Sequence, residues 1–336
     1  MTIRNRFGWS ISRQSLFDEC RRRYFYHYYL SWGGWRPSSP AVVREAFKLK
    51  RLVTPALWRG QLVHYITAKV LQSTKVKGRV PELDDVIRYT MERFERQLEF
   101  SAEKRYRVEP KKRGSRLNID WLALIEHEYG RELDEERIEH IRSECRRGIE
   151  GLYKSPILEL IGSTDRASWM IEDLDHAAFS QSFLYGGVTV FAKTDFIFKG
   201  EGGTFNIVDW KTNRPVESRE PKRGMKRDAR VQLGIYGYWA SSIHKVPAEL
   251  IRLFEVNLLE DGIVMEYPVT EQDIRLFEER IGRGIEELSS VLVEGDTERN
   301  EPLEPGCFPQ IENGLCRRCN FFRICKDRSY PNGIDS

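Results

Sequence analysis

Apolar residues recur with two different periods along this chain. Over residues 81–106 and 121–153 they have helical spacing among many charges, and acidic residues begin each segment. Residues 168–175, 183–199, 204–210 and 250–267 instead read as strands, and a further amphipathic helix is predicted from 270 to about 292. The pattern predicts an α/β fold in which a helical insertion precedes a partly antiparallel sheet.

The predicted strands end in two carboxylates and a lysine. Residues 185–198 read as a hairpin whose second strand carries Asp195, and glycines at 200–203 turn the chain into a strand that closes with Asp209, Trp210 and Lys211. We therefore expect Asp195 and Asp209 on adjacent antiparallel strands. Because strand side chains alternate, Asp209 and Lys211 share one face and Trp210 points to the other.

Carboxylates beside a lysine have the chemistry of a metal-dependent phosphodiesterase. Mg²⁺ and Mn²⁺ are hard cations that take oxygen ligands from one or two carboxylates and from substrate phosphate. A nearby lysine orients water or stabilises developing negative charge. The D-x-K pattern alone is common, and a solvated ion pair is its ordinary structural explanation. Glu172 is a weaker candidate, either at the edge of the site or as an exposed strand carboxylate.

Two helical segments add polar residues in a fixed order. Gly60 and His64 lie one turn apart before the insertion, and Gln232 and Tyr236 lie four residues apart after the D-x-K strand. A lone histidine in a helix is more often a satisfied core residue than a metal ligand, so the order of the motifs carries the argument.

The order G-x3-H, Asp, D-x-K, Q-x3-Y resembles the RecB-type branch of the PD-(D/E)xK nuclease superfamily. The resemblance implies a restriction-endonuclease-like core, a central mixed sheet flanked by helices. It also implies roles for the site residues. His64, Asp195, Asp209 and the carbonyl of Trp210 would bind the metal. Lys211 would orient or activate the nucleophilic water. Gln232 and Tyr236 would support the site or contact the substrate.

Three of six cysteines are clustered as C-x2-C-x5-C at Cys316, Cys319 and Cys325. Clustered thiols in a chain without a recognisable signal peptide favour a metal site over disulfides. Residues 10–26, which contain Cys20, are similar to the N-terminal segment of the iron-sulfur members of that family, the AddB-type nuclease domains and the CRISPR-associated standalone exonucleases. In those members, one N-terminal and three C-terminal cysteines hold a [4Fe-4S] cluster.

The resemblance thus implies that Cys20 completes a cluster that joins the two ends of the chain as a staple. The family often has proline after this cysteine, whereas Arg21 follows here. Four thiolates can equally hold zinc, the alternative occupant. Cys307 is the rival fourth ligand, and Cys145 is most simply a packed free thiol.

The net charge of +3 is too small to indicate nucleic acid by itself, but the positive charges are clustered. One basic stretch covers residues 104–116 and a second covers 214–230, directly after the D-x-K strand. Either stretch can bind backbone phosphates or form a solvated loop. A third group, arginines 21–23 followed by tyrosines and a phenylalanine, reads first as core packing and second as a surface that stacks bases.

Missing motifs narrow the functional classes. The chain has neither G-x4-G-K-[ST] nor G-x-G-x-x-G, so ATP-driven unwinding would need a separate helicase or ATPase. No apolar run approaches the roughly 20 residues of a membrane helix. We therefore expect a soluble, cytoplasmic protein that binds DNA and not a membrane.

These observations predict four regions. They are an N-terminal helical segment (1–74), a helical insertion (75–165), a nuclease core (166–295) and a C-terminal cysteine segment (296–336) that packs with the N-terminus. The predicted function is a Mg²⁺- or Mn²⁺-dependent deoxyribonuclease, an exonuclease on single-stranded or end-containing DNA in repair, CRISPR-type adaptation or mobile-element defence. The alternatives are a catalytically silent nucleic-acid-binding subunit and a zinc-stapled RNA-processing enzyme.

Overall fold

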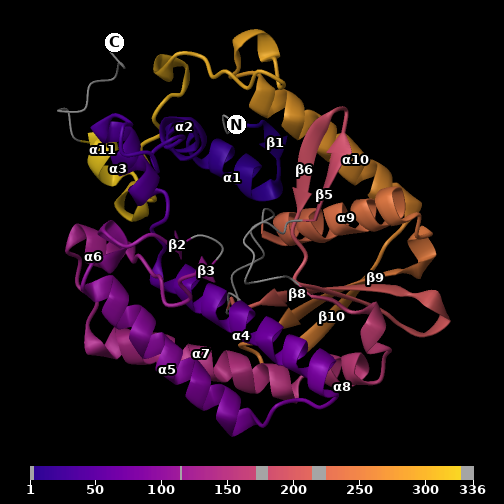
Figure 1. Cartoon of the computed structure of the whole chain (residues 1–336). Coiled ribbons are helices and arrows are strands. Elements are labelled where there is room, and N and C mark those ends of the chain that lie inside the picture. Colours follow the sequence, from indigo (N-terminus) through magenta and orange to yellow (C-terminus); the bar gives the residue numbers. More distant parts are fainter. Residues whose placement is uncertain (1–3, 114–115, 172–180, 214–224, 327–336) are drawn as a thin grey trace.

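A five-stranded mixed sheet lies at the centre of the fold (Figure 1). The computed structural model describes residues 4–113, 116–171, 181–213 and 225–326, and the side chains of residues 113, 116, 181 and 225–233 are outside this description. The strand order is β10-β9-β8-β7-β4, in which only β8 and β9 run parallel. The strands are β4 (Met170–Ile171), β7 (Phe196–Lys199), β8 (Phe205–Lys211), β9 (Ile251–Asn257) and β10 (Ile263–Pro268).

A second, three-stranded sheet contains β1 (Gly8–Trp9), β5 (Gln181–Tyr185) and β6 (Val188–Ala192). The two glycines between β5 and β6 have positive φ angles, which only glycine adopts readily, and they close the predicted hairpin. The hairpin's second strand ends at Ala192, so the expectation that it carries Asp195 was wrong. β6 pairs with β1 and β5 while β7 pairs with β4 and β8, and the chain changes sheets between them.

Helix α4 (Pro55–Lys77) and the helices of the insertion cover one face of the central sheet. The insertion helices are α5 (Leu83–Ala102), α6 (Ile125–Tyr129), α7 (Glu135–Lys154) and α8 (Pro156–Gly162). Thr54 caps α4 by accepting a hydrogen bond from the Leu57 amide, and Asp134 caps α7 in the same way. The helix predicted at 81–106 is confirmed as α5, whereas the one predicted at 121–153 is divided into α6 and α7 after the left-handed Gly130.

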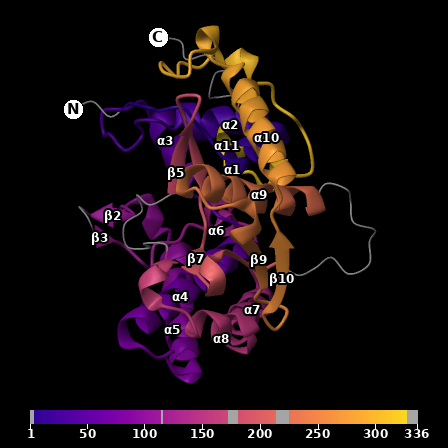
Figure 2. The ribbon, with the colours of Figure 1, turned by 90° about the vertical axis from the view of Figure 1, so that its right-hand side faces the viewer.

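Helix α9 (Met225–His244) packs on the other face of the central sheet, and α10 (Glu271–Ser289) packs against α9 and β1 (Figures 1 and 2). Alternation along β8 divides the core, because Phe205 and Ile207 join the α9 cluster while Val208 and Trp210 join the cluster under α4 and α7. Helix α10 begins with a capping box between Thr270 and Asp273, as the amphipathic pattern predicts. Two mixed sheets flanked by helices thus form a restriction-endonuclease-like architecture.

Both ends of the described chain lie together at one side of the molecule (Figures 1 and 2). The elements here are α1 (Ile11–Glu19), α2 (Arg21–Phe25), a π-helical turn (Tyr26–Leu30), α3 (Ala41–Leu49) and the C-terminal α11 (Phe322–Lys326). The Asn320 amide donates to the carbonyls of Leu49 and Leu52, at 3.1 and 2.7 Å. Tyr24 and Phe25 are buried, and the Phe25 ring packs against Phe308, so these aromatics serve core packing.

The two remaining strands, β2 (Lys112–Arg113) and β3 (Arg116–Leu117), pair with each other within the insertion. Of the predicted strand at 168–175, only residues 170–171 form a strand, β4, because residues 166–168 form a 3₁₀ turn, and residues 172–175, including Glu172, lie outside the described ranges. Among the described helices, none combines the length and the apolarity needed to span a bilayer.

Candidate active site

The carboxyl end of β8 carries the D-x-K residues on the α9 face of the sheet. The Lys211 ammonium lies 2.5 Å from Asp209 Oδ2, and Asp209 is only 3% exposed. The Trp210 side chain is buried on the opposite face, among the residues under α4. Strand alternation therefore brings the carboxylate and the ammonium together, as the two-residue spacing predicts.

Asp195 lies beside this strand end, immediately before β7. The last register pair is Phe196 with Val208, so Asp195 is one position beyond it, next to Asp209. Asp195 Oδ2 accepts a hydrogen bond of 2.9 Å from the Trp210 backbone amide, and Asp195 Oδ1 lies 3.2 Å from His64 Nδ1. The predicted neighbours Asp195, Asp209 and His64 are therefore brought together from two strands and a helix.

Helix α4 holds His64 at this place because its N-terminal part packs closely against the end of β8. A Cβ atom at Gly60 would lie 3.1 Å from Thr212 Oγ1, closer than most such contacts, so glycine permits the approach. Arg59 donates to the Thr212 carbonyl at 2.6 Å and pairs with the buried Glu144 of α7. Arg59 was not predicted from the sequence, in which the only clue to it was its position next to Gly60.

Charges at the site shift one another's ionisation. Burial raises the pKa of Asp209 to about 6, and the Asp195 charge adds to this while Lys211 opposes it. Burial also favours neutral Asp195, but His64, the Trp210 amide and Lys193 outweigh it and lower its pKa. Two carboxylates this close resist ionising together, which is the condition that a bound cation relieves.

Tyr236 of α9 supports the loop that precedes Asp195. Its side chain is 3% exposed, and its hydroxyl donates a hydrogen bond to the Lys193 carbonyl. The tyrosine of the predicted Q-x3-Y pair thus contacts the backbone two residues from a candidate ligand. Gln232 belongs to α9 by its backbone, but its side chain is outside the described part of the structure.

Glu255 is a third carboxylate near the site. It pairs in register with Asp209 on the parallel neighbour β9, and its charge is among the causes that raise the pKa of Lys211 against the effect of burial. Glu255 Oε2 is buried and has no hydrogen-bond partner within the described residues. Our sequence analysis missed Glu255, and the available signal was a single acidic residue inside the apolar run 251–259.

The donor set fits the divalent cation that the sequence resemblance implies. It offers two adjacent carboxylates and an imidazole. One carboxylate oxygen, Asp209 Oδ2, is buried and contacts the Lys211 ammonium without a hydrogen bond of regular geometry. Among the described residues, no three histidine, cysteine or acidic side chains are arranged as a ready-made metal centre. The carboxylates instead face His64 and Lys211.

A cleft of about 650 Å³ opens beside these groups. His64, Lys193 and Lys211 line the end of the cleft next to β8, and its far wall comes from α5 and the segment 111–122 of the insertion. Its volume is that of an ordinary ligand pocket. The candidate site residues therefore border a space that extends to the helical insertion.

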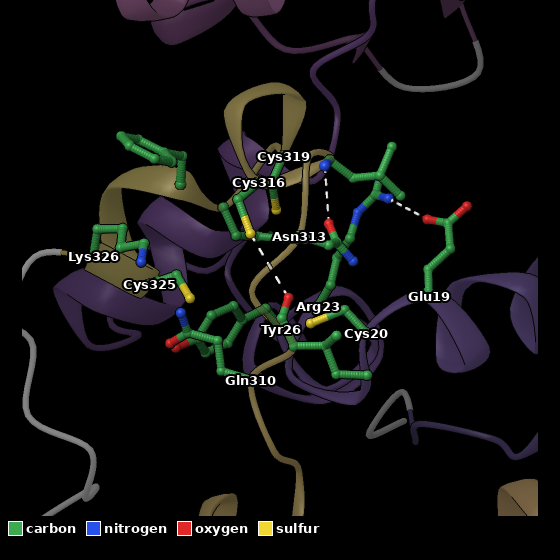
Figure 3. Close-up of a pocket in the computed structure, with 14 residues that line it drawn as sticks. Glu19, Cys20, Arg23, Tyr26, Gln310, Asn313, Cys316, Cys319, Cys325 and Lys326 are labelled. Carbon is green, nitrogen blue, oxygen red and sulfur yellow. Dashed lines mark hydrogen bonds and ion pairs between the residues drawn. The ribbon is translucent and has the colours of Figure 1, made fainter.

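Four cysteines surround a separate cavity between the two ends of the chain (Figure 3). Cys20, between α1 and α2, lies with Cys316, Cys319 and Cys325 of the C-terminal segment around this cavity. The rival Cys307 is exposed and is not among the lining residues. The structure thus brings together the N-terminal cysteine and the C-x2-C-x5-C group.

The thiols of this cavity disfavour one another's ionisation. Burial raises the pKa of Cys325 to about 11, and Cys319, Cys20 and Cys316 add to the shift. Burial also raises the pKa of Cys319, with Cys20 and Cys316 contributing. A cationic centre would reverse this repulsion, so the donor set fits a thiolate-bound metal or cluster. Cys145 is fully buried in the middle of α7, as expected of a packed thiol.

The predicted basic stretches differ in how far they are described. Lys111 lines the cleft, whereas Arg107 is paired with Glu45 and Glu128 inside the fold. The side chains of the second stretch, residues 214–230, lie outside the described part. The first stretch therefore divides into a structural half and a half that borders the site.

Comparison with known proteins places the chain in a family. The sequence matches the PD-(D/E)XK nuclease superfamily over residues 8–326. No curated protein matches. Among solved structures, the crystal structure of SSO0001 is similar at 17% identity and a TM-score of 0.28, covering 80% of this chain and 98% of that one. The family match spans nearly the whole sequence and includes every site residue described above, and the chain accordingly belongs to the PD-(D/E)XK nuclease superfamily.

Proposed function

We propose that this protein is a Mg²⁺- or Mn²⁺-dependent deoxyribonuclease of the RecB-like branch, acting as an exonuclease on single-stranded or end-containing DNA. The observation that carries the proposal is the juxtaposition of Asp195, Asp209, His64 and Lys211 at the end of β8, on the border of an open cleft. Superfamily membership supports hydrolysis of phosphodiester bonds.

In this proposal His64, Asp195, Asp209 and the Trp210 carbonyl hold the cation. When bound, it neutralises charge on the phosphate and acidifies water. Lys211, whose pKa is raised mainly by Asp209 against the effect of burial, stays protonated and orients water or stabilises developing charge. Tyr236 fixes the loop before Asp195 through the Lys193 carbonyl, and Gln232 is assigned a supporting role on the same helix.

We further propose that Cys20, Cys316, Cys319 and Cys325 hold a [4Fe-4S] cluster, with zinc as the alternative occupant. Four thiols around one cavity match the ligand number of both. The cluster would join the first helices to the C-terminal segment. Anaerobically purified protein is expected to contain about four iron and four sulfide per chain, whereas about one zinc per chain and no sulfide would assign the site to zinc.

The test of the nuclease is cleavage of end-labelled DNA in Mg²⁺ and in Mn²⁺. Linear single-stranded, linear duplex and circular substrates are compared for wild type, Asp209→Asn and Lys211→Ala. We expect both variants to lose at least about a hundredfold in rate. Asp85→Asn and Lys77→Ala make matched changes on the exposed surface and should keep wild-type rates.

The substrates and variants separate the outcomes. Digestion of linear but not circular DNA supports an exonuclease, and cleavage of circles would replace that part of the proposal with an endonuclease. Folded, metal-supplied wild type that cuts none of the substrates, or variants that cut as fast as wild type, would refute catalysis and favour a silent DNA-binding subunit. Faster cleavage of RNA than of DNA would favour the RNA-processing alternative.

A further inference from the structure

Three cations from distant parts of the sequence lie in the lining of the cleft or against its lining residue Trp121. Arg51 follows α3, Lys111 precedes β2, and Lys193 lies between β6 and β7. Lys111 and Lys193 both line the cleft. The fold therefore gathers positive charge from the N-terminal segment, the insertion and the nuclease core at one place.

Trp121 organises two of these cations. The Lys111 ammonium lies 5.5 Å and the Arg51 guanidinium 5.7 Å from the centre of its ring, which are cation–π distances. The Trp121 indole donates a hydrogen bond to the Glu109 carbonyl at 3.1 Å, which fixes the ring. Arg51 also stacks on Phe47 at 4.0 Å. The two cations thus have defined positions.

Arg51 and Lys111 are not neutralised within the described residues as Arg107 is. Arg107 pairs with both Glu45 and Glu128, whereas Arg51 and Lys111 have no ion pair with any carboxylate of the described residues. Although its side chain reaches solvent, Lys111 sits deep enough in the cleft for burial to lower its pKa, and Arg51, Lys193 and Lys112 add to the shift. Positive charges that repel one another in a concave wall form a site for an anion.

Lys193 connects this wall to the catalytic centre. It lies two residues before Asp195 and lines the same cleft as Lys111. Its backbone carbonyl accepts a hydrogen bond from the Tyr236 hydroxyl, which fixes the position of the backbone from which the side chain extends. A strand with one phosphate at Lys211 would lie in the same cleft as Lys193 and Lys111.

We propose that Arg51, Lys111 and Lys193 form a phosphate-binding subsite that holds the single-stranded nucleic acid next to the nucleotide at the catalytic centre. The inference deepens the proposed nuclease function and rests on it for the identity of the ligand. A cleft of about 650 Å³ has room for a few unpaired nucleotides. Phosphate contacts would orient the strand and leave the chemical step to the residues at β8.

The test measures binding apart from cleavage. Fluorescence anisotropy of a labelled oligothymidylate is recorded with Asp209→Asn protein in EDTA over a series of salt concentrations. Adding Lys111→Gln should weaken binding about three- to tenfold and make the salt slope shallower by about 0.7, the value for one lost contact with single-stranded DNA. Lys111→Arg should restore most of the affinity, and Lys77→Gln, on the exposed end of α4, should change neither quantity.

Cleavage kinetics with native Asp209 give the second readout. Lys111→Gln should raise KM with kcat within about twofold of wild type, because it removes binding and not transition-state contacts. Equal affinity and slope for Lys111→Gln and Lys77→Gln would overturn the subsite. An equal loss of affinity for blunt duplex would overturn its preference for single strands. A protein that binds through Lys111 but cleaves nothing would refute the proposed nuclease and leave the subsite standing.

Discussion

The end of β8 and the cysteine cavity both bury groups that suit a metal, but they do so in different ways. At β8 the carboxylates of Asp195 and Asp209 are balanced by His64 and Lys211, so opposite charges hold the arrangement together. The cavity gathers four groups of one kind, and its thiols raise one another's pKa. The first site is balanced by protein groups alone, whereas at the second burial and the repulsion between thiols outweigh the favourable charges of Arg22 and Arg23.

This difference predicts different consequences of metal loss. The residues at β8 are fixed by the strand, by the Trp210 amide and by the packing of α4 at Gly60, so losing a cation there should cost catalysis and little stability. Cys20 and the C-terminal cysteines lie almost 300 residues apart in sequence. Losing a cluster there removes a connection between the chain ends, and should cost stability.

Replacing a cavity cysteine gives the largest effect. Cys20→Ser should abolish the iron or zinc content and lower Tm by about 10 °C or more, because structural metal binding contributes ~10 kcal/mol in favourable cases and Tm falls by about 2–4 °C per kcal/mol. Cys307→Ser is the matched control, since Cys307 is exposed and outside the cavity. Metal analysis and calorimetry of both variants test this. Loss of metal from Cys307→Ser with retention in Cys20→Ser would transfer the fourth ligand to Cys307.

The C-terminal segment is also held by an ionic network that needs no thiols. Glu128 is 4% exposed, accepts a hydrogen bond from Tyr106, and pairs with Arg107 and with Arg323 of α11. Glu128→Gln should lower the free energy of unfolding by about 2–3 kcal/mol, because it removes a buried carboxylate and leaves two half-buried cations with one carboxylate, Glu45.

Urea denaturation measures that loss, and Glu135→Gln is the control. Glu135 is exposed, so its replacement should cost less than about 1 kcal/mol. Burial opposes ionisation of Glu128, but Arg107 outweighs it and lowers the pKa. A carboxyl group whose pKa is lowered by folding stabilises the fold at any pH above the ordinary carboxyl pKa. The difference in stability between wild type and Glu128→Gln should therefore persist at neutral pH, and shrink only as acid protonates Glu128 in the wild type. A cost equal to that of Glu135→Gln would show that this ionic network does not help to join the ends.

The sequence predicted the elements of both sites better than the way the chain connects them. Local spacing was enough to predict strand β8 and helices α4 and α10. The grouping of Cys20 with the C-terminal cysteines could be predicted because the chain has few cysteines. The change of sheet at residues 193–194 was missed, because no glycine or proline marks it and β6 and β7 are both apolar. Glu255 was missed for a related reason, since only the parallel register with β8 brings this residue beside Asp209.

A smaller effect is expected from the hydrogen bond behind Asp195. Tyr236→Phe removes the hydroxyl that donates to the Lys193 carbonyl, while the ring keeps its packing. We expect kcat to fall about tenfold with little change in KM, equivalent to about 1.4 kcal/mol of lost positioning. Tyr238→Phe, also on α9, is the control and should leave both constants unchanged. A change in KM with kcat unaltered would assign Tyr236 to substrate binding instead.

The smallest effect concerns a histidine close to the cysteine cavity. Burial lowers the pKa of His27 to about 3, and Lys50, Arg23 and Arg13 add to the shift. The unfolded chain, with an ordinary histidine pKa near 6.5, therefore binds the proton more readily, and this group makes stability fall as pH decreases below about 6.5. The slope for one full proton is about 1.4 kcal/mol per pH unit. His27→Phe keeps a ring against Tyr28 and should make the decline of unfolding free energy between pH 6.5 and about 5 shallower by up to that amount. An unchanged slope would mean that the ring is protonated in the folded protein, and that the packing around the cavity accepts a charge even without a metal.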